Sequence, residues 1–306
     1  MGNDHDDTAE LPGWNQRDPR QPAGASSLVE VELAALSHPG KVRRNNEDHF
    51  MAARFDRTMR TLSTNLPEGE VPSGYAETVY GLLVADGVGG SAAGEVASRT
   101  AIHAIVDLVL ETPDWIMRLD DRLAEEVLAR MERRFQRVRE TLIERANADP
   151  GLRGMATTMT VACSIGPELL TAHVGDSRAY VFRKGGRLER LTRDQTMAQS
   201  LADAGAISQD EVSRHPSRHV LTSALATRGA FVQVQLKRSR LEDGDQLLLC
   251  SDGLTEMVSD EAIARVLATA GPPAEACRQL VDLALEAGGK DNVTVVLARY
   301  RIPVTP

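Results

Sequence analysis

Two kinds of hydrophobic pattern alternate along the chain. Apolar residues spaced three and four apart predict helices at 92–110, 118–146, 259–269 and 273–287. Short apolar runs bounded by glycine, proline or polar turns predict strands at 29–36, 49–55, 79–85, 158–165, 169–174, 179–183, 188–191, 231–236, 246–250 and 292–301. Strands interrupted by paired helices predict an α+β protein, with helices packed outside largely antiparallel sheets.

Three regions lack these patterns. Residues 1–26 are polar and have almost no apolar periodicity, so we expect a disordered tail before one domain at 27–302. Residues 56–78 contain two prolines and two glycines and are expected to form a long insertion loop, functional or mobile. Residues 194–220 are rich in small polar residues after a helical start at 196–204.

Composition narrows the classes of partner. The formal charge is 35 − 44 = −9, and basic residues are scattered among acidic ones, which argues against nucleic acid as a partner. No apolar stretch approaches the roughly twenty residues that cross a membrane. The cysteines, Cys163, Cys250 and Cys277, lie far apart and show no CxxC spacing, so we expect reduced thiols in a cytoplasmic protein.

Two of the apolar runs end in Asp-Gly, at Asp86-Gly87 and at Asp252-Gly253. A run that stops in this way predicts a buried strand that brings a carboxylate to the edge of the core, where a turn allows close backbone approach to a ligand. Glu47-Asp48 and Asp291-Asn292 also lie at the ends of strand-like segments. Oxygen ligands of this kind indicate a site for a hard divalent cation.

Each of these turns has an ordinary structural interpretation, such as a solvated turn, a hairpin connection or a helix C-cap. Their occurrence in this order is not explained by unrelated turns. From about residue 28 to 300 the chain resembles the bacterial metal-dependent protein phosphatases, the PP2C-like serine/threonine phosphatases. The matching segments are Val42-Arg43, Asn46-Glu47-Asp48, Asp86-Gly87-Val88-Gly89-Gly90, Gly94-Glu95-Val96-Ala97, Thr157-Thr158, Gly175-Asp176-Ser177-Arg178-Ala179-Tyr180, Leu191-Thr192-Arg193-Asp194, Ser251-Asp252-Gly253-Leu254 and Asp291-Asn292.

The resemblance implies a β-sandwich of two antiparallel sheets flanked by helix pairs, with two Mn²⁺ or Mg²⁺ ions at one end. It implies that Asp86 bridges both ions and that a third, weaker ion binds nearby. The other implied metal ligands are Asp252 and Asp291 for the first ion, Glu47 and the Gly87 carbonyl, partly through waters, for the second, and Asp176 with Asp252 for the third, while Asp48 supports the inner shell of ligands.

The implied activity is hydrolysis of phosphoserine and phosphothreonine in proteins by a hydroxide shared between the two ions. Arg43 matches the catalytic arginine that binds the phosphate oxygens, whereas Arg44 is expected to be a solvated neighbour. The implied partners are phosphorylated proteins and a cognate serine/threonine kinase whose action the enzyme reverses. We expect the protein to be a monomer.

Three positions depart from the family pattern. Val88 stands where eukaryotic members often have a histidine that is a candidate general acid, so water must protonate the leaving group. Ala156 replaces the first residue of a Gly-Thr-Thr motif, and Gln195 replaces the histidine of an Asp-His pair. None of these changes removes an implied metal ligand.

In bacterial relatives, the segment matching 194–220 is a flap beside the active site, and we expect it to select substrates. His215 and His219 in this flap are four residues apart, but Pro216 disfavours the helix that would align them on one metal. We therefore interpret them as surface residues or local hydrogen-bond partners. His173 is expected to be a core or edge histidine.

Two other functions remain open from the sequence. One is a non-catalytic scaffold that binds phosphoproteins, although a pseudoenzyme is expected to lose at least one of the implied residues. The other is a phosphatase domain in a stress-signalling cascade that acts on an anti-sigma-factor antagonist. That arrangement usually includes a sensor domain, for which the sequence offers no room.

Overall fold

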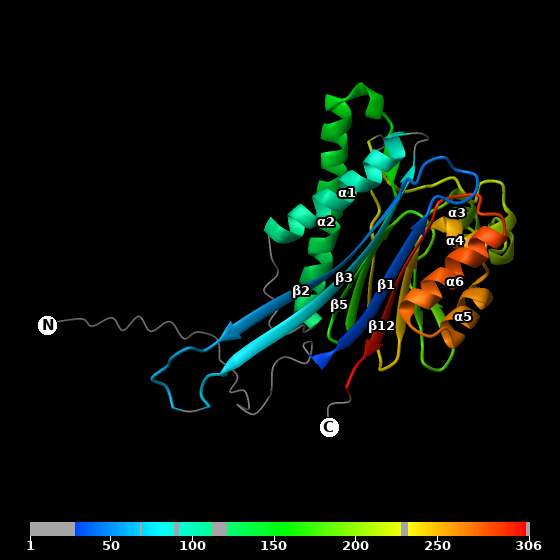
Figure 1. The fold of residues 1–306 in the computed structure, drawn as a ribbon. Coiled ribbons are helices and arrows are strands. Elements are labelled where there is room, and N and C mark those ends of the chain that lie inside the picture. Colours follow the sequence, from blue (N-terminus) through cyan, green and yellow to red (C-terminus); the bar gives the residue numbers. More distant parts are fainter. Residues whose placement is uncertain (1–27, 68, 89–91, 112–120, 228–231, 304–306) are drawn as a thin grey trace.

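The computed structural model describes residues 28–303 except 68, 89–91, 112–120 and 228–231. Its strands form two antiparallel sheets (Figure 1). The first sheet has the order β1 (Glu30–His38), β12 (Val293–Arg301), β11 (Gln246–Cys250), β7 (Arg178–Phe182) and β8 (Leu188–Arg190). The second has the order β10 (Gln235–Arg240), β6 (Glu168–Val174), β5 (Met159–Ile165), β3 (Gly74–Val88), β4 (Ala156–Thr157) and β9 (Leu225–Ala226), and β2 (Asp48–Arg60) pairs with β3.

A pair of helices covers the outer face of each sheet (Figure 1). Helices α1 (Ala92–Glu111) and α2 (Asp121–Ala148) pack on the second sheet, and α5 (Asp260–Thr269) and α6 (Pro273–Glu286) pack on the first. The remaining helices are short: 3-10 helix η2 (Pro150–Leu152), α3 (Met197–Asp203), 3-10 helix η3 (Gln209–Arg214) and α4 (Asp252–Thr255).

Alternate residues of the central strands fill different apolar layers. In β3, Leu82 lies in the layer between the sheets, whereas Leu83 packs toward α1 and α2. In β11, Leu249 lies between the sheets and Leu248 packs toward α5 and α6. Strands buried on both faces read as continuous apolar runs, which explains why the sequence marks them so clearly. The predicted α+β sandwich with flanking helix pairs is confirmed.

The prediction of a loop over 56–78 is wrong at both ends. Strands β2 and β3 stay paired from Asp48 opposite Asp86 to Arg60 opposite Gly74, so the turn spans only 61–73. Along the outer part of this ribbon most side chains are exposed or half-buried, so the apolar pattern fades. The backbone ladder nevertheless continues because it satisfies its own hydrogen bonds without a core.

The strand predicted at 231–236 begins instead at Gln235, and residue 231 lies outside the described part. Strand β10 is a polar edge strand that is defined by its backbone pairing with β6. The short strands β4 and β9 gave no separate signal in the sequence. The tail expected at 1–26 lies outside the described residues.

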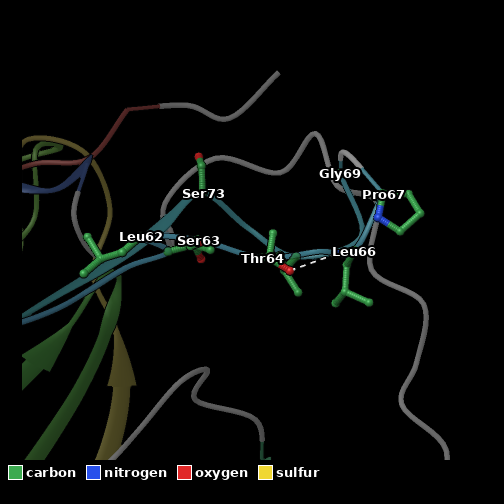
Figure 2. A pocket seen from close by; sticks show the side chains of 9 residues that line it. Leu62, Ser63, Thr64, Leu66, Pro67, Gly69 and Ser73 are labelled. Carbon is green, nitrogen blue, oxygen red and sulfur yellow. Dashed lines mark hydrogen bonds between the residues drawn. The ribbon is translucent and has the colours of Figure 1, made fainter.

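The turn at the outer end of the β2–β3 hairpin contains a hollow of about 290 Å³ (Figure 2). Its lining includes Thr61, Leu62, Leu66 and Val71, and none of the described residues that line it is charged. The hollow lies at the opposite end of the hairpin from Asp48 and Asp86, so the chemistry must be sought elsewhere. Among the described helices, none is both long and apolar enough to cross a membrane.

Candidate metal centre

The inner end of the β2–β3 hairpin places two carboxylates side by side. Asp48 lies directly opposite Asp86 in the ladder. The Asp86 amide donates to the Thr158 hydroxyl at 3.1 Å, and its carbonyl accepts from the Thr158 amide and the Thr157 hydroxyl, each at 2.8 Å. These bonds fix the end of β3 and therefore the direction in which Asp86 leaves the strand.

A buried serine links Asp48 to the other sheet. The Ser251 hydroxyl donates to Asp48 Oδ2 at 2.6 Å and accepts from the Thr294 amide at 3.0 Å. The other carboxylate oxygen, Asp48 Oδ1, is buried and has no hydrogen-bond partner among the described residues. A buried acceptor left unsatisfied in this way costs free energy, and a cation nearby would compensate it.

Glu47 reaches the centre because two glycines let the backbone come close. The Gly87 amide donates to the Glu47 carbonyl at 3.2 Å. A Cβ on Gly87 would lie 2.2 Å from the Gly94 carbonyl oxygen, and a Cβ on Gly94 would lie 2.2 Å from Glu47 Oε2. Any larger residue at the start of α1 would therefore push the Glu47 carboxylate away.

Asp291 lies just before β12 and pairs with an arginine. Arg43 Nη2 donates to Asp291 Oδ2 at 2.6 Å, and the side chains of Arg43 and Asp291 are 55% and 32% exposed. The hydrogen bond to Asp291 is the main reason why the pKa of Arg43 is raised. The predicted phosphate-binding residue thus lies beside a predicted metal ligand and keeps access to solvent.

Asn292 is a structural residue of the centre whose contacts sequence reasoning missed. Its side-chain oxygen accepts from the Glu47 amide at 2.8 Å, and its Nδ2 donates to the carbonyls of Pro39 and Asn45, each at 2.9 Å. It holds the 39–47 segment against the start of β12. Its position after Asp291 was visible in the sequence, but its partners lie some 250 residues away and left no local signal.

The electrostatics show that the acidic residues are close enough to repel one another. Burial raises the pKa of Asp86 and of Asp252 well above the usual value, and neighbouring carboxylates raise both further. Burial raises the pKa of Asp48 to about 6, and burial followed by repulsion from Asp194 raises that of Asp176 to about 7. Burial also raises the pKa of Glu47.

This donor set fits divalent cations. Several buried or half-buried carboxylates act on one another electrostatically with few positive charges between them, and their ionised forms are disfavoured without a counter-charge. Hard cations such as Mg²⁺ and Mn²⁺ prefer such oxygen ligands. Asp252 feels the charge of Asp176 more than that of any other neighbour, so Asp176 also belongs to the cluster.

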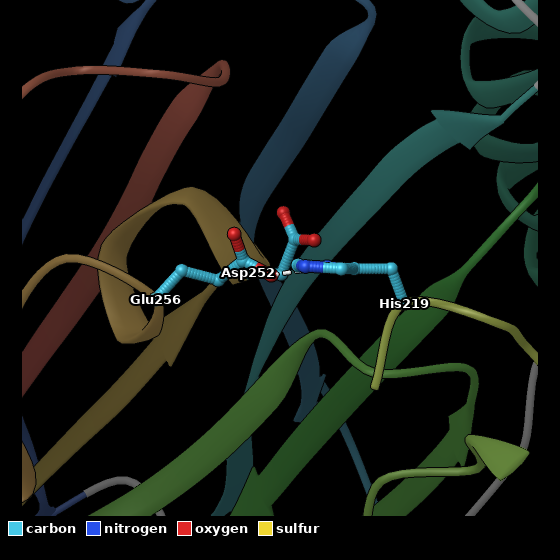
Figure 3. Close-up of side chains that lie close together, drawn as sticks. All are labelled: His219, Asp252 and Glu256. Atoms are coloured by element: carbon cyan, nitrogen blue, oxygen red, sulfur yellow. Dashed lines mark ion pairs between the residues drawn. The ribbon is translucent and has the colours of Figure 1, made fainter. Parts of the chain in front are cut away.

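A tighter group of ligand atoms lies at the edge of this cluster. His219, Asp252 and Glu256 have ligand atoms within 4.8 Å of one another, and no other His, Cys, Asp or Glu group in the described part meets that spacing (Figure 3). His219 is an exposed surface residue as expected, but its Nδ1 also contacts Glu256, which lies outside the flap. His215 is a local partner, since its Nδ1 accepts from the Ser217 amide at 3.2 Å.

In the sequence, the feature that points to this group of three side chains is the spacing of Asp252 and Glu256, which are four residues apart at a helix start. His173 is buried as expected, with Nδ1 2.8 Å from the Thr160 hydroxyl. Gly89 and Gly90 of the glycine-rich motif lie outside the described residues.

The sequence profile of the "Protein phosphatase 2C" family matches residues 74–285, which is more than half of the chain. The chain belongs to the protein phosphatase 2C family. Its relatives include the serine/threonine protein phosphatase PstP of Mycobacterium tuberculosis, 37% identical over 275 residues. The alignment covers 90% of this chain but 46% of PstP, so this family member spans about half the length of that relative.

Other relatives are closer to this chain in length. The serine/threonine phosphatase stp of Listeria monocytogenes is 33% identical over 216 residues, which cover 71% of this chain and 82% of that protein. The crystal structure of M. tuberculosis PstP matches with a TM-score of 0.70 and 36% identity, covering 88% of this chain and 98% of that one. A structure of the PstP catalytic domain in complex with two manganese ions matches with a TM-score of 0.68 and 34% identity, covering 89% of this chain and 99% of that one.

Proposed function

We propose that this PP2C-family protein is a metal-dependent phosphatase that hydrolyses phosphoserine and phosphothreonine in proteins. The observation that carries the proposal is the cluster of buried and half-buried carboxylates at the ends of both sheets, with an exposed arginine beside it. The names of the relatives, which are serine/threonine phosphatases, support the same substrate class.

In this proposal Asp86 is the ligand shared by two ions, as the family resemblance implies, and its place opposite Asp48 near the end of β3 supports that role. Asp48 supports the site through the serine that joins the sheets. The other proposed ligands are Asp252 and Asp291 for one ion, Glu47 and the Gly87 carbonyl for the other, and Asp176 with Asp252 for a weaker third. The manganese reported for the PstP catalytic domain supports Mn²⁺ or Mg²⁺ as the ions.

Bound ions would lower the pKa of a coordinated water and neutralise charge on the phosphate. The protein itself contributes Arg43, whose planar guanidinium binds two phosphate oxygens at once. Because that side chain is 55% exposed, it has room to turn from Asp291 toward a phosphate. Val88 offers no proton at the position discussed above, so water protonates the leaving oxygen.

We also propose that the protein acts as a monomer in the cytoplasm, where it reverses a serine/threonine kinase. Among the described cysteines, Cys250 and Cys277 are free thiols, which suits a reducing compartment.

Hydrolysis of a phosphothreonine peptide tests the proposed activity. We expect phosphate release that requires Mn²⁺ or Mg²⁺ and that falls by ~10³-fold or more in Asp86→Asn and Asp252→Asn, because each change removes a ligand charge. Asp282→Asn in α6 is the matched control and is expected to retain full activity. Peptide binding without hydrolysis in either metal would favour the non-catalytic scaffold.

A further inference from the structure

We propose that His219, Asp252 and Glu256 form a nitrogen-containing cation site that takes a first-row transition metal ion such as Mn²⁺, Co²⁺ or Zn²⁺. The inference rests on the proposed function only in that Asp252 would serve both this site and the proposed centre. It assigns His219 and Glu256, which the all-oxygen centre does not use.

The three side chains converge from two segments of the chain (Figure 3). Asp252 and Glu256 lie at the start and just after the end of α4, and the Glu256 amide donates to the Asp252 carbonyl at 2.8 Å. This helical turn puts both carboxylates on the same side. His219 approaches them from the flap, and its ring points toward Glu256.

The backbone on both sides of His219 is held in place. The Arg218 amide donates to the His215 carbonyl and the Val220 amide donates to the Ser217 carbonyl, each at 3.1 Å. The Met197 amide donates to the Val220 carbonyl at 2.7 Å, which ties this turn to the beginning of α3. The imidazole is therefore presented by a hydrogen-bonded turn.

The spacing and exposure suit a metal with open coordination positions. Ligand atoms within 4.8 Å of one another need only small side-chain adjustments to bind one ion. The side chains of His219 and Glu256 are 43% and 23% exposed, so water can complete the coordination. Asp176 adds negative charge, because it acts electrostatically on Asp252 and feels the charge of Glu256.

The donor types decide which ions the site prefers. An imidazole nitrogen binds first-row transition ions more strongly than it binds Mg²⁺ or Ca²⁺, which favour oxygen alone; among these ions the preference is stronger for Co²⁺ and Zn²⁺ than for Mn²⁺. The site would thus accept an ion under conditions in which Mg²⁺ fills the carboxylate centre. It would also fasten the flap to α4, so that occupancy changes how the flap borders the catalytic centre.

The test uses the whole chain with excess Mg²⁺ and a titration of Mn²⁺, which is followed by electron paramagnetic resonance. We expect the wild type to hold one Mn²⁺ against Mg²⁺, with a coupling to the imidazole ¹⁴N in the pulsed spectrum. His219→Ala should abolish that coupling and weaken this Mn²⁺ at least ~10-fold, and Glu256→Gln should weaken it similarly. His215→Ala, which changes the neighbouring flap histidine, should leave both quantities unchanged.

Two results would overturn the proposed site: no ¹⁴N coupling in the wild type, or an unchanged Mn²⁺ affinity in His219→Ala. Either result would mean that the contact of His219 with Glu256 is only an ion pair between the flap and α4. Circular dichroism and the melting temperature check that the variants fold. Phosphopeptide hydrolysis is measured separately in Mg²⁺. Hydrolysis without nitrogen coupling refutes the new site alone, and nitrogen coupling without hydrolysis refutes the proposed function alone.

Discussion

The two ends of the β2–β3 hairpin share one backbone ladder but differ in everything that surrounds it. At the inner end, Asp48 is 4% exposed and lies opposite Asp86. At the outer end, Met59 is 43% exposed and Leu62 is 89% exposed. Regular pairing therefore says little about function, and the contacts made by the ends of the strands decide it.

Those contacts differ in sequence range. The inner end is bonded to Thr158 and Ser251, which belong to segments 72 and 203 residues away. The outer end is bonded within its own turn, from the Thr61 amide to the Ser73 carbonyl at 3.0 Å and from the Thr61 hydroxyl to the Pro72 carbonyl at 2.7 Å. Chemistry is concentrated where distant segments hold polar groups against one another.

The substitution expected to have the largest effect adds a methyl group at the inner end of the hairpin. In Gly94→Ala the new Cβ would lie 2.2 Å from Glu47 Oε2 and 2.9 Å from the Gly87 carbonyl, so the proposed ligand must move. We expect kcat/KM for a phosphothreonine peptide to fall by ~100-fold, since small displacements of reacting groups have large kinetic effects. The melting temperature should change little, because alanine also favours the helix.

Gly185→Ala is the matched control for that substitution. A Cβ on Gly185 meets no atom within 4 Å, and the residue lies in the turn between β7 and β8. The Gly185→Ala variant should retain activity within about twofold of the wild type, as expected of a surface substitution. Full activity in Gly94→Ala would remove Glu47 from the proposed set of ligands.

The second test is the pH dependence of metal stabilisation at the inner end. The folded-state pKa values of Asp48 and Asp176, about 6 and about 7, lie above the ordinary value of 3.8. Their ionised forms are therefore disfavoured in the metal-free fold, which loses stability as pH rises from below 3.8 through 7. Mn²⁺ binds the ionised forms, so it should raise the melting temperature more near pH 8 than near pH 5.

Thermal melts in Mn²⁺ and in a chelator, compared across this range, measure the effect. Asp86→Asn should reduce the increase in melting temperature that Mn²⁺ causes at the higher pH, because it removes one of the charges that attract the ion. An increase in melting temperature that is the same at both pH values would contradict the assignment of these carboxylates as ligands.

The inner end was predictable from the sequence because burial leaves a pattern there. Leu82 to Ala85 are fully or almost fully buried, and the apolar run stops at Asp86. The family resemblance then assigned Asp252 and Asp291 to the same end. Each of these residues ends or precedes a strand whose hydrophobic pattern could be recognised without the structure.

The contacts between distant segments were not predictable. The approach of His219 to Glu256 depends on how the flap folds, and a histidine in an irregular segment has no periodicity to interpret. The prediction of a loop at the outer end of the hairpin was wrong for a different reason. The exposed strands there lack a buried face that would show in the sequence. Backbone pairing without burial is nearly invisible in the pattern of apolar residues.

The smallest effect is expected at the outer end. Leu62→Ala should change the free energy of unfolding by less than about 0.5 kcal/mol, because the side chain is 89% exposed. Leu82→Ala, the same substitution in β3 at a fully buried position, should cost about 2–5 kcal/mol. Urea unfolding measures both, and peptide hydrolysis by Leu62→Ala should stay at the wild-type rate. The variant could instead lose activity toward a phosphorylated protein while its peptide rate stays unchanged. That result would show that the outer end of the hairpin contacts protein substrates, a function that no buried contact of this ribbon indicates.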